Sequence, residues 1–178
     1  MNIRLPNRPL VATWLSPRRR TALYVLALLC WIGALALPAV DVTRSTPLTT
    51  GGWDPGDAPE VARGMTLLLW GAMLLPFHPQ AMFGWLANPL FIFSVVLTPL
   101  CRTCQCRTRL SFFLWPAVLL AAISVPLYNA SPMLGDEGGV TYNVITALHI
   151  GYALWLAAPL LLLAALALRN LVEPIQPK

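Results

Sequence analysis

Long apolar segments constrain this chain more than any other feature of its sequence. Residues 21–40 and 144–168 contain no Asp, Glu, Lys or Arg and exceed the roughly 18 apolar residues that a membrane-spanning helix needs. Residues 81–100 are also uncharged and long enough, and residues 110–127 form a shorter apolar run between an arginine cluster and a polar loop. We therefore expect four transmembrane helices.

The overall composition agrees with a protein that lies in a bilayer. Of its 178 residues, 57% are hydrophobic and only 11% are charged, whereas charged residues make up about 25% of ordinary soluble domains. The net charge of +5 comes from arginines that gather in short runs between the apolar segments. A nucleic-acid-binding surface would instead alternate basic and aromatic residues. The sequence predicts a single all-α transmembrane domain over residues 1–178, with the lipid bilayer as a partner and no nucleic acid.

The basic N-terminus predicts the orientation of the first helix. Arg4, Arg8 and the triplet Arg18 to Arg20 precede the apolar run 21–40. Because positively charged flanks stay in the cytoplasm, we expect a cytoplasmic N-terminus and a multi-pass protein of the bacterial inner membrane. A cleavable signal peptide is the alternative. This apolar run is longer than the roughly 7 to 15 residues of a signal-peptide core, so an uncleaved first span is expected.

Polar segments between the apolar runs predict loops. Residues 41–60 carry several prolines and a pair of glycines, which cannot hold a long helix, and are expected to form an exterior loop. Residues 128–143, which contain two acidic residues, form the second exterior loop. The arginine-rich residues 101–109 form a cytoplasmic loop under the positive-inside rule.

The number of spans depends on residues 64–100, which are all uncharged. As one helix they would be about 55 Å long, against a hydrocarbon core of about 30 Å, so the two prolines Pro76 and Pro79 must break the stretch. If both halves crossed the membrane, there would be five spans and the arginines of residues 101–109 would lie outside, against the charge rule. Four spans are favoured, with a short amphipathic or re-entrant helix over about residues 61–77 on the outer side; five spans are the alternative.

Three cysteines in the loop 101–109 form the densest reactive cluster. Cys101, Cys104 and Cys106 include a Cys-x-x-Cys pair, which can bind zinc or carry redox chemistry. A closed zinc site needs a fourth ligand, and neither Cys30, inside the first span, nor a nearby histidine supplies one. We expect inert thiols that stay reduced in the cytoplasm, and no bound cofactor; metal binding is the alternative.

Five residues form a candidate exterior site: His78, Asn88, Asp136, Glu137 and His149. Both topologies place the two histidines on the same side of the membrane, where they could share a haem or metal site with the acidic pair. Asn88 precedes a proline, which indicates either a plain kink or the start of a discontinuous helix of the kind that lines binding sites in transporters. The plain kink is favoured.

The sequence lacks the common catalytic motifs. It has no glycine-rich phosphate loop, no His-Glu-x-x-His pair and no serine in a Gly-x-Ser-x-Gly setting. Small residues such as Gly33 and Gly151 suit close helix contact. We expect a non-enzymatic protein that works as a small subunit or accessory factor of a membrane assembly, with other membrane subunits as partners. A small transporter or a haem- or metal-carrying membrane protein is the alternative.

Two motifs resemble segments of small bacterial multi-span membrane proteins that have no assigned function. The Trp-Leu-Ala-Asn-Pro-Leu segment at residues 85–90 is similar to one that opens a helix in those proteins, and the Gly-Tyr-x-Leu-Trp-Leu-Ala segment at residues 151–157 to one that opens their last helix. The resemblance implies a shared architecture in which both motifs begin helices near the exterior face. It implies no activity, ligand or catalytic residue.

Overall fold

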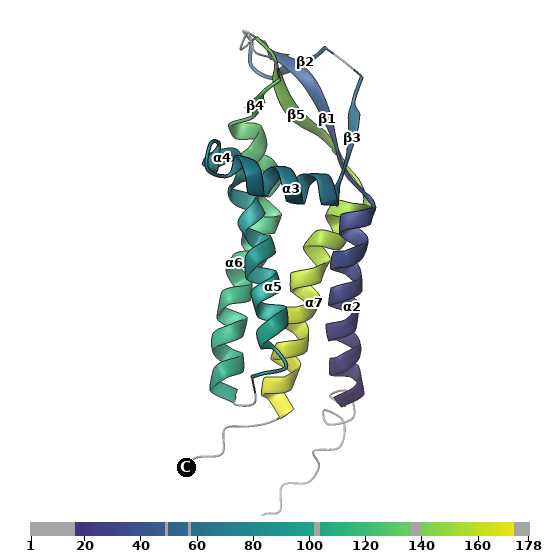
Figure 1. Ribbon diagram of the computed structural model, residues 1–178, viewed down its shortest axis with the longest axis vertical. Coiled ribbons are helices and arrows are strands. Elements are labelled where there is room, and N and C mark those ends of the chain that lie inside the picture. The colour runs from purple at the N-terminus through teal and green to yellow at the C-terminus, as the bar shows by residue number, and fades with distance from the viewer. Residues whose placement is uncertain (1–16, 49, 57, 102–103, 136–139, 173–178) are drawn as a thin grey trace, which may run out of the picture.

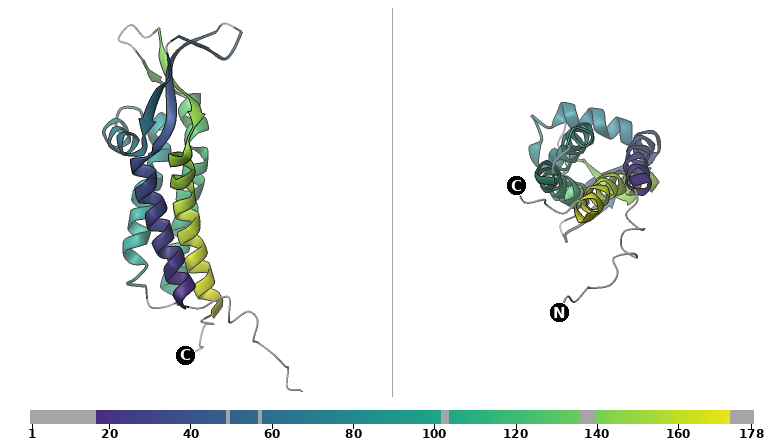
Figure 2. Two further views of the ribbon diagram at one scale, coloured as in Figure 1. Left: turned by 90° about the vertical axis from the view of Figure 1, so that its right-hand side faces the viewer. Right: turned by 90° about the horizontal axis from the view of Figure 1, so that it is seen from below.

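A helical bundle carries a small β-sheet at one end (Figure 1). The computed structural model describes residues 17–48, 50–56, 58–101, 104–135 and 140–172. Four helices run side by side along the long axis (Figures 1 and 2). They are α2 (Pro17–Ala36), α5 (Ala87–Leu97), α6 (Cys104–Ala130) and α7 (Ile150–Val172). We call the end of the bundle that carries the sheet the sheet end, and the end where α5 connects to α6 the turn end.

The sheet is antiparallel and is built around one long central strand. Its strands are β1 (Pro38–Pro47), β2 (Trp53–Pro55), β3 (Glu60–Arg63), β4 (Met133–Leu134) and β5 (Tyr142–Leu148). Strand β1 pairs with β5 along one edge and with both β2 and β3 along the other, and β4 pairs with β5. The expectation of an all-α bundle is therefore wrong, because the fold is α+β.

The sheet has a local sequence basis that a reading for long helices overlooks. Residues 38–47 and 142–148 are rich in the β-branched residues Val, Ile and Thr, which fit a pleated surface. Pro38 has no backbone N–H to continue α2, which ends at Ala36, and α7 begins only at Ile150. The apolar runs 21–40 and 144–168 thus each contain part of a strand. The segments expected as exterior loops contain β2 and β4, and most of β3 lies in residues 61–77, where a short helix is expected.

Three helices are long and apolar enough to cross a membrane, namely Arg18–Ala36, Gln105–Ala130 and Ile150–Ala167. The fourth expected span, residues 81–100, is divided among α4 (Pro79–Met82), the 3-10 helix η1 (Phe83–Leu86) and α5. The apolar helical stretch Phe83–Leu97 packs against α6 and is about 22 Å long at the usual rise per residue. It falls short of a standard span by length alone.

A short helix crosses the bundle instead of running along it. Helix α3 (Gly64–Leu74) lies within residues 61–77, where a short helix is expected, and extends from the end of β3 to α4 across the sheet end (Figures 1 and 2). A Cβ atom at Gly64 would overlap the backbone carbonyl of Ala34 in α2. Glycine at this position therefore allows α3 to begin directly on the end of α2.

Candidate ligand cavity at the sheet end

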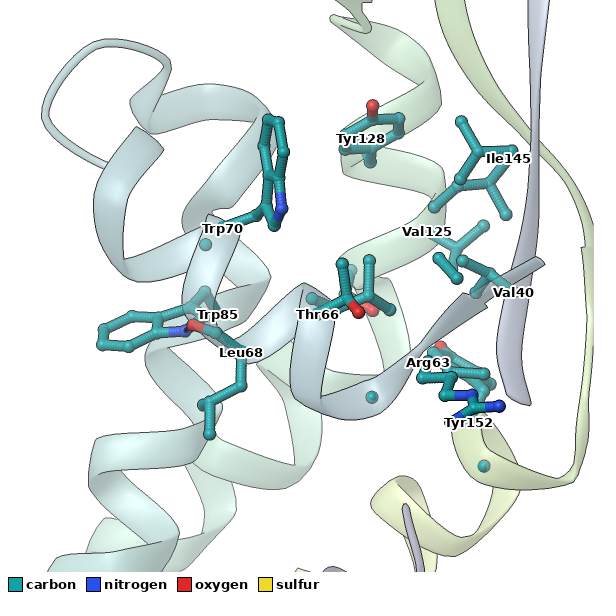
Figure 3. A pocket seen from close by; sticks show the side chains of 18 of the residues that line it. Val40, Arg63, Thr66, Leu68, Trp70, Trp85, Val125, Tyr128, Ile145 and Tyr152 are labelled. Carbon is teal, nitrogen blue, oxygen red and sulfur yellow. Dashed lines mark hydrogen bonds between the residues drawn. The ribbon is translucent and has the colours of Figure 1, made fainter. Parts of the chain in front are cut away.

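A cavity of about 940 Å³ lies where the sheet, α3 and the bundle meet. Figure 3 shows side chains from all three parts of the fold around it. The sheet contributes apolar residues of β1 and β5, α3 closes one side, and α6 and α7 contribute aromatic residues. The residues labelled in Figure 3 are Val40, Arg63, Thr66, Leu68, Trp70, Trp85, Val125, Tyr128, Ile145 and Tyr152.

Alternation along β1 builds the sheet side of the cavity. Val40, Val42 and Arg44 line it, whereas the residues between them do not. Successive side chains of a strand point to opposite faces, so this spacing gives one apolar face that ends in a cation. On the alternate positions, Thr43 contacts Thr146 of β5 through their hydroxyl groups at 3.1 Å, which joins the two long strands beside the cavity.

Hydrogen bonds fix the aromatic walls in place. The Trp85 indole Nε1 donates to the backbone carbonyl of Leu68 in α3 at 2.8 Å, and the Tyr152 hydroxyl donates to the carbonyl of Ala121 in α6 at 2.9 Å. A Cβ atom at Gly71 would overlap the indole of Trp85, so α3 lies directly on this ring. The walls are thus held by contacts within the protein and do not need a ligand to form.

Asn88 lies at the bundle side of the cavity and joins three helices. It is 6% exposed. Its side-chain oxygen accepts hydrogen bonds from the Trp155 indole at 2.9 Å and the Trp31 indole at 3.4 Å, and its amide nitrogen donates to the carbonyl of Trp85 at 3.1 Å. This candidate site residue lines the cavity, and its polar atoms are used to hold α2, α5 and α7 together.

The other candidate site residues lie elsewhere. His149 is at the junction of β5 and α7, where its Nε2 lies 2.7 Å from Oδ1 of Asp41 and its backbone N–H donates to Ala39. His78 precedes α4, and Figure 1 shows α4 and the β5–α7 junction at opposite ends of α3. Asp136 and Glu137 lie outside the described residues. Among the residues that the structure describes, no group of three His, Cys, Asp or Glu side chains could hold a metal ion.

The cysteine cluster lies at the turn end, away from the cavity. Cys101 and Cys106 form a disulfide, in contrast to the reduced thiols that the sequence predicts. Cys30 is a buried free cysteine within α2. The side chain of Cys104 lies outside the described part of the structure.

Sequence reasoning missed most of the cavity. Its sheet side comes from residues 38–47 and 142–148, which were assigned to spans and loops. The available signal was the alternation of Val40 and Val42 with the polar residues Asp41 and Thr43, since a period of two is typical of a strand. The α3 side could be predicted in part, because the sequence predicts a short helix over residues 61–77.

Comparisons with known proteins give no further guide to the site. The chain matches no protein-family model, no curated protein and no solved structure. The likeness of residues 85–90 and 151–157 to small bacterial membrane proteins therefore stays a prediction. The geometry of the cavity is therefore the basis for inferring function.

Proposed function

We propose that this chain is a non-enzymatic membrane protein that binds an amphipathic, lipid-like molecule in the cavity at its sheet end. The observation that carries this proposal is the cavity itself, which has a volume of about 940 Å³ and joins an apolar helical bundle to a polar sheet. Pockets for small molecules commonly have volumes of about 300–1,000 Å³ and mostly apolar walls with a few polar groups. In this role the protein would serve as a binding or accessory factor for other membrane subunits.

The charge distribution supports a bacterial inner-membrane protein with its N-terminus in the cytoplasm. Arg18 to Arg20 begin α2 at the turn end, and Arg107 and Arg109 are on α6 at the same end. Acidic residues such as Asp54 and Glu60 are in the sheet. Under the positive-inside rule the turn end faces the cytoplasm and the sheet faces the exterior.

With this orientation α3 lies at the outer surface of the bilayer. Its exposed side chains outside the cavity include Leu69 and Met73, which are 58% and 72% exposed. Apolar helices that lie in the membrane plane bury such side chains at the boundary between headgroups and acyl chains. The cavity behind α3 is then at the same depth, where a molecule with an apolar body and a polar head has its lowest free energy.

Binding is favoured over catalysis because the polar groups on the bundle and α3 sides of the cavity, those of Trp85, Tyr152 and Asn88, have structural roles. Trp85 and Tyr152 donate to backbone carbonyls, and Asn88 accepts from two tryptophans. These contacts hold the shape of the cavity. A rigid, mostly apolar pocket suits retention of a ligand, since little conformational entropy is lost on binding.

The proposal is tested by filling the cavity. Val125 lines the cavity on α6, and Val125→Trp would occupy part of its volume. Val96→Trp is the matched control, since Val96 is 58% exposed on α5 and is outside the cavity. Both variants and the parent protein are purified from native membranes in mild detergent, and the lipid-like molecules retained by each are measured by native mass spectrometry.

We expect the parent protein and Val96→Trp to retain a bound amphipathic molecule at about one per chain, and Val125→Trp to retain less than about a tenth of that amount. The expected loss follows from overlap of the indole with the ligand. Forcing extra volume into a packed space costs about 1–3 kcal/mol, here taken from the free energy of ligand binding. Equal retention by all three proteins would show that bound lipid lies on the outer surface of the bundle and would overturn the proposal.

A further inference from the structure

We infer that the bound amphipathic molecule is an anionic phospholipid and that Arg63 binds its phosphate. This inference rests on the proposed function, and it adds the chemical class of the headgroup and the residue that recognises it. The charge of the cavity, the position of Arg63 and the chemistry of guanidinium groups each support it.

The cavity has an excess of positive charge among the residues that the structure describes. The charged side chains that line it are Arg44, Glu60 and Arg63. Within the described part of the chain, neither arginine forms an ion pair with Glu60. Glu60 therefore neutralises neither guanidinium group.

Arg63 is the cation at the depth of the membrane surface. It ends β3, directly precedes α3, and pairs with Pro38, the first residue of β1. Since α2 ends at Ala36, this register fixes Arg63 at the level where the bundle meets the sheet. Phospholipid phosphates lie at that level when the bundle occupies the hydrocarbon core.

Arg44 is too far away to share the same phosphate. It is six residues beyond Pro38 on β1, which corresponds to about 20 Å along the strand at the usual rise per residue. Arg44 therefore lies in the part of the sheet farthest from the bundle. The two arginines form a matched pair for a test, because both line the cavity and only Arg63 is at the depth of the headgroups.

Guanidinium chemistry favours a phosphate over a neutral headgroup. Arginine binds phosphate through two parallel charge-assisted hydrogen bonds, and its planar group is weakly hydrated. Arg63 is exposed although it lines the cavity, so a phosphate at the membrane surface can reach its guanidinium group. The phosphate of phosphatidylcholine is compensated by its choline, so a lipid with net negative charge should bind more tightly.

The experiment uses fluorescent phosphatidylglycerol and phosphatidylcholine that carry the same acyl chains. Binding to the full-length protein in detergent is followed by fluorescence anisotropy. The parent protein should bind phosphatidylglycerol about tenfold more tightly than phosphatidylcholine. Arg63→Gln should lose this preference and keep the affinity for phosphatidylcholine within about twofold, which also shows that the variant is folded. Arg63→Lys, which keeps the charge without the bidentate geometry, should retain part of the preference.

Arg44→Gln and Arg18→Gln are the controls, and both should keep the preference for phosphatidylglycerol within about twofold of the parent. The inference is overturned if the parent protein binds both lipids equally, or if Arg63→Gln keeps the full preference. Failure of the proposed function is a different result: Val125→Trp would then bind both lipids as well as the parent protein does. If Val125→Trp loses both lipids while Arg63→Gln behaves like the parent protein, the cavity binds lipid without selecting the phosphate through Arg63.

Discussion

Asn88 illustrates how one polar residue can organise an apolar bundle. Its side-chain oxygen accepts from Trp31 and Trp155, which are 57 and 67 positions away in the chain. A lone asparagine in an uncharged segment indicates that some polar partner exists, because an unsatisfied amide in hydrocarbon costs free energy. The sequence does not specify the partner, since this depends on which helix faces are in contact.

Replacing Asn88 with leucine should destabilise the bundle by about 1–2 kcal/mol. The two side chains have the same number and branching of non-hydrogen atoms, so the main effect is that two indole N–H groups lose their acceptor in an apolar setting. Unfolding of the purified protein by sodium dodecyl sulfate in mixed micelles, followed by circular dichroism, measures the free energy of unfolding.

Ser94→Ala is the control for this prediction. Ser94 is fully buried on the same helix, but its hydroxyl donates only within α5, to the carbonyl of Leu90. Ser94→Ala should lower the free energy of unfolding by less than about 0.5 kcal/mol, because an intrahelical hydrogen bond of this type adds little stability. If Asn88→Leu and Ser94→Ala proved equally mild, Asn88 would not hold the three helices together.

The elements of this fold meet through close backbone approaches as well as through side chains. A Cβ atom at Gly151 would lie 2.5 Å from the carbonyl oxygen of Pro38, and one at Gly84 would overlap Ser124 of α6. These glycines allow α7 to begin on β1 and η1 to pack on α6. Gly151 was recognised from the sequence as suited to close contact. The contact that it makes is with the end of a strand, which was not expected.

Gly84→Ala should reduce the free energy of unfolding by about 1–3 kcal/mol, because the added methyl group would push η1 away from α6. Gly33→Ala serves as the comparison. Its Cβ would meet only the end of the flexible Leu154 side chain at 3.3 Å, and alanine favours a helix by about 1 kcal/mol over glycine. The same denaturation assay should show Gly33→Ala at or above the stability of the parent protein. Equal losses for both variants would contradict the packing described for η1.

The strands were harder to predict than the helices for a physical reason. The apolar content of residues 21–40 and 144–168 is sufficient for a span, so the β-branched residues at their sheet-facing ends did not alter the assignment. Strand β1 is stabilised by pairing with β5, and the partners Val42 and Ile145 are about a hundred residues apart. Such long-range pairing cannot be predicted from the local sequence, because the β-propensity of a residue depends strongly on the strands that pair with it in the fold.

Considered as a whole, the molecule combines an apolar bundle with a polar sheet, and the cavity forms at their boundary. Charge places the arginine-rich turn end in the cytoplasm in the proposed orientation. The Cys101–Cys106 disulfide is at this end, where thiols are normally kept reduced. The proposed orientation rests on the arginines, whereas a disulfide at this end would favour the exterior.

The cavity could not be predicted from the sequence because it requires all parts of the fold together. The sheet side depends on the pairing of β1 with β5, and the opposite side on α3, which crosses the bundle. The sequence did predict the short helix over residues 61–77 and the break at Pro76 and Pro79 that follows it. It therefore indicated the region of the site without the strands that complete it.

The most direct test of ligand binding in the cavity is photo-crosslinking with a phosphatidylglycerol that carries a diazirine in one acyl chain. The protein is reconstituted in lipid nanodiscs, irradiated and digested, and the modified peptides are identified by mass spectrometry. Binding in the cavity predicts adducts near Asn88 and Trp155, which line the cavity on its bundle side, and their loss in Val125→Trp. Adducts confined to outward-facing positions of the helices, such as Val96 and Ile92, and unchanged in that variant, would contradict it.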